Sequence, residues 1–426
     1  MMGSVLSGIR TVVFIAAGIA AIVALLASSG AAEEPTLEWT KPLGTVVQSA
    51  PLYNNNFLFI STYDGHMYGL WSENSVTQWK KNYTGSITET PKIIDRTLYF
   101  GTSSGILYMV DGNTGDVIWQ YNAKANIDCT PLLYNNLLIF GADNGEIYAI
   151  NTNSRSLEWN YSSNSGFISK ALDAGDNTLY FGSQKGRLFA VDIMTGKARW
   201  STQLGDPNTT QVYAPTLYGN TVYVGVQDGA LYAIDSKIGN VIWKYQMGGA
   251  VVSQPLCQPG YIYAGSQDGY LYVINMTTGE LAWKFQTDGP VTATPGFGTG
   301  GISSGILYVA SEDGNIYAVD AKLGGLPYWQ FSTSEIIDST PLVTRDHLYF
   351  VSLNGNVYSL KLPKQITLTT PNPTLTPTPT GDPSATPVET PTIVPLPSES
   401  SQAPLNPLIV PTGVAIAVLL LARRRR

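Results

Sequence analysis

Eight of the nine tryptophans recur at a nearly constant interval, and this repeat restricts the possible folds more than any other feature of the sequence. They are spaced by 40, 40, 40, 41, 43, 40 and 46 residues. A fixed period near 40 residues indicates a solenoid, a propeller or an array of repeats. The repeated tryptophans are Trp39, Trp79, Trp119, Trp159, Trp200, Trp243, Trp283 and Trp329.

Each repeat has the pattern of three β-strands and two tight turns, preceded by a short strand. In the sixth repeat, β-rich runs alternate with the dipeptides Asp268-Gly269 and Thr278-Gly279, which are typical of short turns. The runs are residues 261–265, 270–274 and 281–285, and the short strand begins at Pro255. Four antiparallel strands in one repeat predict a propeller blade.

The first tryptophan is out of step with the turns, and this offset predicts how the ring closes. Eight glycine-containing turns begin with Asp64-Gly65 and end with Asn354-Gly355, but no tryptophan follows the last turn and Trp39 precedes the first. The strand from Thr36 to Lys41 is therefore predicted to be the outer strand of the last blade, which removes exposed sheet edges. The predicted fold is all-β, an eight-bladed β-propeller of four-stranded antiparallel blades over residues 33–362.

Two repeats show the consensus of the pattern most clearly. Residues 228–235 read Asp-Gly-Ala-Leu-Tyr-Ala-Ile-Asp and precede Gly239 and Trp243, and residues 187–192 are followed in the same way by Trp200. This pattern resembles the pyrroloquinoline-quinone-like β-propeller repeat family, and the resemblance extends over residues 36–362. It implies that all eight repeated tryptophans dock against the neighbouring blade instead of stacking on a ligand.

The resemblance leaves the function open, because the family contains quinoprotein dehydrogenases and non-catalytic members such as the outer-membrane assembly lipoprotein. For a dehydrogenase it implies a vicinal disulfide beneath the quinone, a calcium ion held by Glu, Asn and Asp, and a catalytic Asp. Cys129 and Cys257 lie three blades apart, and long inserted loops are missing. We predict no enzyme, no catalytic residues and no cofactor. The alternative is a quinone-dependent dehydrogenase or a polysaccharide-acting enzyme.

Polar residues just before the first strand of successive blades are predicted to face the central channel. Three of them, Glu89, Asp128 and Asp338, are candidate contacts for an ion or a small polar ligand on the axis. No other metal site is predicted. The full set of channel candidates is Gln48, Glu89, Asp128, Cys129, Lys170, Gln254 and Asp338.

Two further features have structural interpretations. His66 and His347 are interpreted as solvated residues at turn edges. The glycine-rich stretch 296–301 is interpreted as an insertion between the first two strands of the seventh blade and not as a phosphate loop, because no helix is expected after it.

The N-terminus has the order of a secretory signal peptide. Arg10 precedes the apolar stretch 11–26, which is followed by small residues and then by acidic ones. Residues 1–32 are therefore predicted to be a signal peptide cleaved after Ala31 or Ala32, with an uncleaved anchor as the alternative. In both cases the propeller is exported.

The C-terminus is predicted to tether the chain to a membrane. Residues 363–407 contain 12 of the 26 prolines, which predicts an extended, disordered Pro/Thr stalk. Residues 408–426 form an apolar segment with four terminal arginines, which hold that end in the cytoplasm. This arrangement resembles the sorting signals read by sortases, exosortases and archaeosortases, with Val410-Pro411-Thr412-Gly413 as the motif. A plain single-span anchor is the alternative.

Charge and sequons complete the expected functional class. The formal charge is −7 and the only basic run is C-terminal, so we predict no nucleic-acid partner. The chain is predicted to lie on the extracellular face of the cell membrane and to bind or scaffold envelope or extracellular proteins or glycans. A structural surface-layer component is a further alternative, and an archaeal source is one option. The predicted glycosylation sites are Asn82, Asn160, Asn208 and Asn275.

Overall fold

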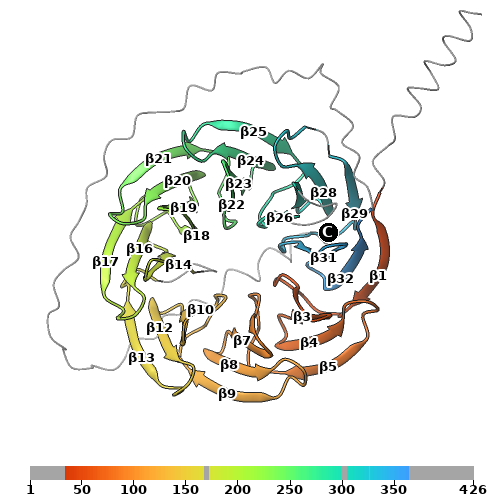
Figure 1. Cartoon of the computed structure of the whole chain (residues 1–426), viewed down its shortest axis with the longest axis horizontal. Helices are drawn as coiled ribbons and strands as arrows, with labels where there is room; N and C mark the ends of the chain where they lie inside the picture. Colours follow the sequence, from red (N-terminus) through yellow and green to blue (C-terminus); the bar gives the residue numbers. More distant parts are fainter. Residues whose placement is uncertain (1–33, 167–171, 299–304, 326, 364–426) are drawn as a thin grey trace, which may run out of the picture. The chain divides into compact units, whose positions relative to one another are not determined.

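Eight sheets form a ring in the computed structural model (Figure 1), which describes residues 34–363 apart from 167–171, 299–304 and 326. Within these residues, 32 strands build eight four-stranded antiparallel sheets, and the predicted eight-bladed propeller is confirmed. None of the described residues forms a helix long and apolar enough to cross a membrane. The predicted signal peptide, the stalk beyond its first residue and the C-terminal segment lie outside the described residues.

The blades follow one another along the chain, and each contains four consecutive strands except the last. Blade 1 has β2 (Leu52–Asn54), β3 (Phe57–Ser61), β4 (His66–Trp71) and β5 (Thr77–Asn82). Blade 2 has β6 (Lys92–Ile94), β7 (Thr97–Gly101), β8 (Ile106–Asp111) and β9 (Val117–Asn122). Blade 3 has β10 (Leu132–Tyr134), β11 (Leu137–Gly141), β12 (Glu146–Asn151) and β13 (Leu157–Ser162). Blade 4 has β14 (Asp173–Gly175), β15 (Thr178–Gly182), β16 (Arg187–Asp192) and β17 (Ala198–Gln203).

The second half of the ring repeats this order. Blade 5 has β18 (Val212–Tyr218), β19 (Thr221–Val226), β20 (Ala230–Asp235) and β21 (Val241–Gln246). Blade 6 has β22 (Leu256–Gln258), β23 (Tyr261–Gly265), β24 (Tyr270–Asn275) and β25 (Leu281–Gln286). Blade 7 has β26 (Gly296–Phe297), β27 (Ile306–Ala310), β28 (Asn315–Asp320) and β29 (Trp329–Ser332). Blade 8 has β30 (Leu342–Val343), β31 (His347–Val351) and β32 (Asn356–Lys361), together with β1 (Thr36–Pro42).

Strand β1 closes the ring as predicted. The strand order in the last sheet is β1-β32-β31-β30, and β1 pairs antiparallel with β32 from Thr36 opposite Lys361 to Pro42 opposite Asn356. The register shifts between Leu37 and Trp39, so Glu38 is the extra residue of a β-bulge. The first strand of the domain therefore completes the sheet formed by its last three strands.

The repeated tryptophans lie on the outer strands, and their indole rings contact the next blade. Trp200 in β17 is 8% exposed, and its Nε1 donates to the carbonyl of Ser236 in blade 5 at 3.0 Å. Its ring packs on Gly239, where a Cβ would lie 2.7 Å from ring carbons. Corresponding bonds run from Trp39 to Ser72, from Trp79 to Gly112, from Trp159 to Ile193 and from Trp243 to Met276.

An Asp or Asn at the end of the third strand of most blades fixes the turn that follows. In blade 5, the Oδ1 of Asp235 accepts backbone hydrogen bonds from Lys237 at 2.8 Å and from Ile238 at 3.1 Å. Such an Asx turn holds the chain without a longer loop. The residues that form it in other blades are Asp111, Asn151, Asp192, Asn275 and Asp320.

The ring has two faces with different loops. Because the strands are antiparallel, the turns between first and second strands and between third and fourth strands lie on one face, which we call the turn face. The opposite face, the connector face, carries the turns between second and third strands and the segments that lead to the next blade. There the backbone N–H of Tyr63 donates to the connector carbonyl of Val46 at 2.9 Å, and Ser103 bonds Ser86 equivalently.

Candidate functional site

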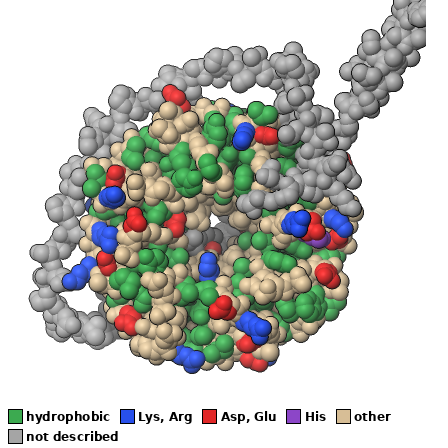
Figure 2. All heavy atoms as spheres, viewed as in Figure 1, with side chains coloured by type: hydrophobic (Ala, Val, Ile, Leu, Met, Phe, Trp, Pro, Cys, Tyr) green, Lys and Arg blue, Asp and Glu red, His purple; other side chains and the backbone are tan. Residues whose placement is uncertain are grey.

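The segments that enter each blade line the centre of the ring, where Figure 2 shows a hollow. Side chains just before the first strands bond the neighbouring blade. The Oγ1 of Thr130 donates to the carbonyl of Thr90 at 3.0 Å, and the Nε2 of Gln254 donates to the carbonyl of Pro215 at 2.8 Å. The Oγ1 of Thr294 donates in turn to the carbonyl of Gln254 at 3.0 Å. These polar residues therefore join blades to one another around the channel.

Cys129 does not face the channel, so that prediction is wrong. Its side chain is 1% exposed, and its Sγ lies 3.5 Å from the carbonyl oxygen of Gly141 in the same blade. Burial raises the pKa of its thiol well above the usual range. Ser49 occupies the equivalent position in blade 1 and donates to the carbonyl of Ser61 at 3.0 Å. This position packs into the sheet, one residue away from the channel-lining position that the sequence suggested.

The three acidic channel candidates are not brought together as an ion site. Asp128 accepts a hydrogen bond from the Oγ1 of Thr88 at 2.5 Å, which links blades 2 and 3. Within the part of the chain that the structure describes, no three His, Cys, Asp or Glu side chains form a group that could hold a metal ion. Glu89 and Asp338 are half-buried and Gln48 is exposed, whereas Lys170 lies outside the described residues.

Asp143 on the connector face is an acidic residue that the sequence reasoning missed. Burial raises its pKa, and the nearby charge of Asp128 raises it further, although a 2.6 Å hydrogen bond from Asn126 acts in the opposite direction. Asp143 lies two positions before the turn glycine Gly145, so a comparison of the residues that precede each turn glycine would have found it. Its surroundings raise the pKa of the carboxyl but supply no ligand set.

The cysteines do not fit the quinone site that the family resemblance implies for an enzyme. Cys129 in blade 3 and Cys257 in blade 6 are both free thiols. Burial raises the pKa of Cys257 to about 12, with the charge of Asp173 as a second cause. Neither sulfur is placed for the vicinal disulfide on which such a quinone would rest.

His347 lies at a turn edge, at the start of β31, and its partly exposed ring is held between acidic side chains. Its Nε2 lies 2.9 Å from the Oε2 of Glu38 and its Nδ1 lies 2.9 Å from the Oδ1 of Asp346. The ring stacks on Tyr349 with centroids 5.8 Å apart. Lys361 also approaches Glu38, with its Nζ 3.8 Å from Oε1. Because Glu38 belongs to β1, these contacts join the N-terminal strand to the end of the domain.

Glu335 joins blade 7 to blade 8 on the connector face. Burial alone would raise the pKa of this carboxyl, but hydrogen bonds from the side chains of Ser352, Asn354 and Asn356 lower it below its ordinary value. The Oγ of Ser352 is 2.6 Å from Oε2, and both carboxylate oxygens lie 3.1 Å from the Nδ2 of Asn356. The ionised carboxylate therefore holds the connector to the ring-closing blade.

The remaining sequence features lie at loops. His66 begins β4, beside the turn that precedes it, with its Nδ1 3.0 Å from the Oδ1 of Asp64. The glycine-rich stretch leads from β26 to β27, although residues 299–304 lie outside the described residues. Among the four sequon asparagines, Asn82, Asn160 and Asn208 are exposed. Asn275 is half-buried and its Oδ1 accepts the two hydrogen bonds of an Asx turn.

Large apolar side chains are exposed at the turn tips of one part of the ring. These tips join the third and fourth strands on the turn face. Met194 in blade 4 is 49% exposed, Ile238 in blade 5 is 57% exposed and Leu323 in blade 7 is 63% exposed. The same tip positions in blades 1, 2, 3 and 6 carry only polar residues, which are Glu73, Asn74, Asn113, Thr114, Asn153, Ser154, Thr277 and Thr278. A comparison of the seven tips in the sequence would have found this difference.

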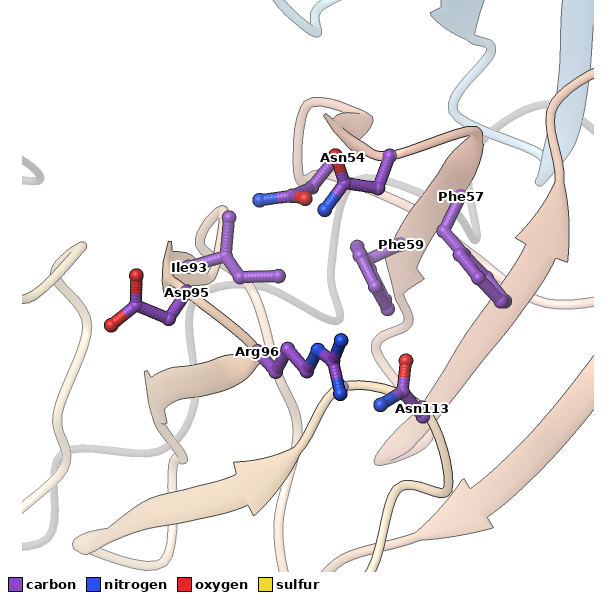
Figure 3. Close-up of a pocket in the computed structure, with 9 residues that line it drawn as sticks. Asn54, Phe57, Phe59, Ile93, Asp95, Arg96 and Asn113 are labelled. Atoms are coloured by element: carbon purple, nitrogen blue, oxygen red, sulfur yellow. The ribbon is translucent and has the colours of Figure 1, made fainter.

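A cavity of about 260 Å³ opens between blades 1 and 2 on the turn face (Figure 3). The turn between β2 and β3 supplies one wall, and two turns of blade 2 supply the other. Sequence reasoning did not identify any of its residues. They are Asn54, Asn55, Phe57, Phe59, Ile93, Asp95, Arg96, Gly112 and Asn113.

Comparison with known families supports the repeat assignment. Four overlapping segments of the chain, residues 3–128, 95–215, 207–298 and 291–364, match the family model described as outer membrane protein assembly factor BamB. The chain belongs to the BamB family. The predicted resemblance of its propeller to that group of repeats is confirmed. Among curated protein sequences, no match was found.

Solved structures share the fold of this BamB-family chain at low sequence identity. BamB from Moraxella catarrhalis is 20% identical with a TM-score of 0.66, covering 77% of this chain and 100% of that one. The computationally designed protein Ika8 is 16% identical with a TM-score of 0.66, over 77% and 98% of the two chains. Quinohemoprotein alcohol dehydrogenase from Comamonas testosteroni is 13% identical with a TM-score of 0.62, over 77% of each chain. These identities show the fold alone, and the fold serves both enzymes and non-enzymes.

Proposed function

We propose that this chain is an exported, surface-tethered propeller that acts as a non-catalytic binding or scaffolding module for envelope proteins. Membership of a family described by an outer membrane protein assembly factor supports a role in contacts with other proteins. The signal peptide, the stalk and the C-terminal segment expected from the sequence place the propeller on the extracellular face of the membrane in this proposal.

The apolar turn tips are the observation that carries the proposal. Met194, Ile238 and Leu323 project from loops whose equivalents in other blades are polar, and each exposes about half of its side chain or more. Burying apolar surface against a partner stabilises the complex by about 25 cal/mol per Å². Exposed apolar residues with polar surroundings occur at protein-binding surfaces. We therefore propose that the partner binds the turn face at blades 4, 5 and 7.

The enzyme alternative receives less support from the residues. A dehydrogenase with a similar propeller exists, but the two thiols of this chain lie in different blades and are both buried or half-buried. Nothing in the geometry of the described blades favours the surface-layer alternative over a binding module.

The proposal is tested by charging the turn tips. The full chain, tagged and produced in its native cells, is purified with its cross-linked partners as wild type and as the double variant Ile238→Asp, Leu323→Asp. We expect the variant to recover about tenfold less of the major envelope protein, because burying two carboxylates is costly. Tyr63→Asp is the matched control, since Tyr63 is 53% exposed on the connector face. Equal recovery with the double variant and the control would contradict the proposal.

A further inference from the structure

The cavity between blades 1 and 2 exists because three positions there depart from the repeat. The equivalence of positions is fixed by one backbone hydrogen bond, which joins the residue after the third strand to the turn between the first and second strands. In blade 2, Gly112 N–H donates to the carbonyl of Arg96 at 2.6 Å. The corresponding pairs are Ser72 with Asn56, Thr152 with Asn136, Ile193 with Asn177, Ser236 with Asn220, Met276 with Gly260, Ala321 with Gly305 and Leu362 with Asp346.

Gly112 is the first departure. Every other blade has a residue with a side chain at this position. A Cβ built on Gly112 would lie 3.6 Å from the Cδ1 of Ile93 and 2.9 Å from the carbonyl oxygen of Arg96. Both of these residues line the cavity. Gly112 therefore places no side chain beside Ile93, and its backbone lies close to the carbonyl of Arg96.

Phe59 is the second departure. Six of the other blades have a tyrosine here, and in blades 4 and 6 its hydroxyl donates to the carbonyl of the residue equivalent to Gly112. Tyr180 bonds Ser236 at 3.1 Å and Tyr263 bonds Ala321 at 2.8 Å. Phe59 has no hydroxyl, so the space between its ring and Gly112 is not occupied in this way. The six tyrosines are Tyr99, Tyr180, Tyr223, Tyr263, Tyr308 and Tyr349.

Arg96 is the third departure, because the other seven blades have Asn, Gly or Asp at this position. Figure 3 shows its guanidinium group directed across the cavity toward Asn113 and Phe59, whereas the carboxylate of Asp95 is directed away from it. Within the described residues, no hydrogen bond or ion pair is assigned to this guanidinium. Its five N–H donors are therefore available to a ligand.

We propose that this cavity binds a sugar residue that carries a carboxylate, of the hexuronic acid type, within a glycan. A volume of about 260 Å³ is just below the range for drug-sized ligands and suits a single sugar ring. Arg96 would pair with the carboxylate through two parallel hydrogen bonds. The proposal does not rest on the protein-binding surface of blades 4, 5 and 7.

The other lining residues match the remainder of such a ring. Asn54, Asn55 and Asn113 each offer a donor and an acceptor, which is the pairing that sugar hydroxyls need. Phe57 is half-buried and stacks on Trp71 with centroids 4.4 Å apart, so an apolar aromatic wall is held in place for the C–H face of the sugar. An acidic peptide side chain would use Arg96 but would leave most of the amides without partners.

Variants that restore the repeat provide the test. Titration calorimetry on the full chain in detergent micelles uses an oligosaccharide of glucuronic acid, with a neutral glucose oligosaccharide and a glutamate-rich peptide as comparisons. We expect Arg96→Asn to weaken binding of the acidic oligosaccharide by at least about tenfold. Phe59→Tyr and Gly112→Ser introduce residues that other blades carry here, and we expect each to weaken binding by occupying part of the space between Phe59 and Gly112.

Two controls separate binding from folding. Arg345→Asn removes one positive charge from the corresponding turn of blade 8 and should leave binding unchanged. Thermal melting identifies any variant that fails to fold. If the tight contact at Gly112 makes Gly112→Ser unstable, Phe59→Tyr alone tests the effect of occupying this space. The proposal is overturned if the wild type does not bind the acidic oligosaccharide or if folded Arg96→Asn binds it equally. Stronger binding of the glutamate-rich peptide would also overturn it and assign the cavity to a peptide.

Discussion

Deleting residues 33–45 is expected to prevent the propeller from forming a stable closed ring. The deletion removes the six residue pairs between β1 and β32 and leaves β32 as an unprotected sheet edge. It also removes Trp39, whose Nε1 donates to the carbonyl of Ser72 in blade 1 at 3.0 Å. Trp39 is half-buried, and its loss adds to the cost of losing the strand.

Circular dichroism of the full chain during heating measures this effect. We expect the truncated chain to melt far below the wild type or to aggregate on purification. Glu38→Gln is the control, because it keeps the strand and removes only the charged contacts with His347 and Lys361. Partly exposed ion pairs contribute about 0 to 1 kcal/mol, so this control should melt close to the wild type. An unchanged melting temperature for the deletion would show that β1 is dispensable for the ring.

Truncation of an interblade tryptophan is expected to have the second largest effect. Trp200→Ala removes a ring that is 8% exposed, its hydrogen bond to Ser236 and its contact with Gly239. We expect the free energy of unfolding to fall by about 3 to 5 kcal/mol, since the rigid sheets on either side close the cavity only in part. Urea unfolding of the full chain, followed by fluorescence, gives this value.

Trp71 provides the matched comparison for Trp200. It is the one tryptophan outside the repeat. It is half-buried against Phe57, whereas Trp200 lies between an outer strand and the next blade. Trp71→Ala should therefore cost less, about 1 to 2 kcal/mol. Equal losses for Trp71 and Trp200 would indicate that the interblade position has no special role in stability.

The fold could be predicted because its determinants are local and repeated. The tryptophan period, the turn glycines and the offset of Trp39 together specified the blades and the closing strand. Contacts between distant positions were not accessible in this way. Glu38 and His347 are 309 residues apart, and only the closed ring shows that they meet. Cys129 was misplaced because a shift of one residue in an extended segment exchanges the channel side for the sheet side.

The candidate sites were missed because they consist of exceptions to the repeat. A consensus contains the residues that the blades share, and these are the residues that build the ring. Phe59, Arg96 and Gly112 each look unremarkable alone, and only their convergence on one cavity distinguishes them. The apolar tips at Met194, Ile238 and Leu323 likewise differ from their equivalents in a single property. In a repeat protein the shared residues describe the scaffold, and the departures indicate where it binds.

Photo-cross-linking in intact cells is the measurement that tests the binding role most directly. A photoreactive aromatic amino acid replaces Ile238 on the turn face of the full chain, and in a second strain it replaces Tyr63 on the connector face. We predict that irradiation attaches an envelope protein at position 238, at a yield at least about tenfold above that at position 63. Absence of an adduct at position 238, or equal adducts at both positions, would contradict the assignment of this propeller as a binding module that uses its turn face.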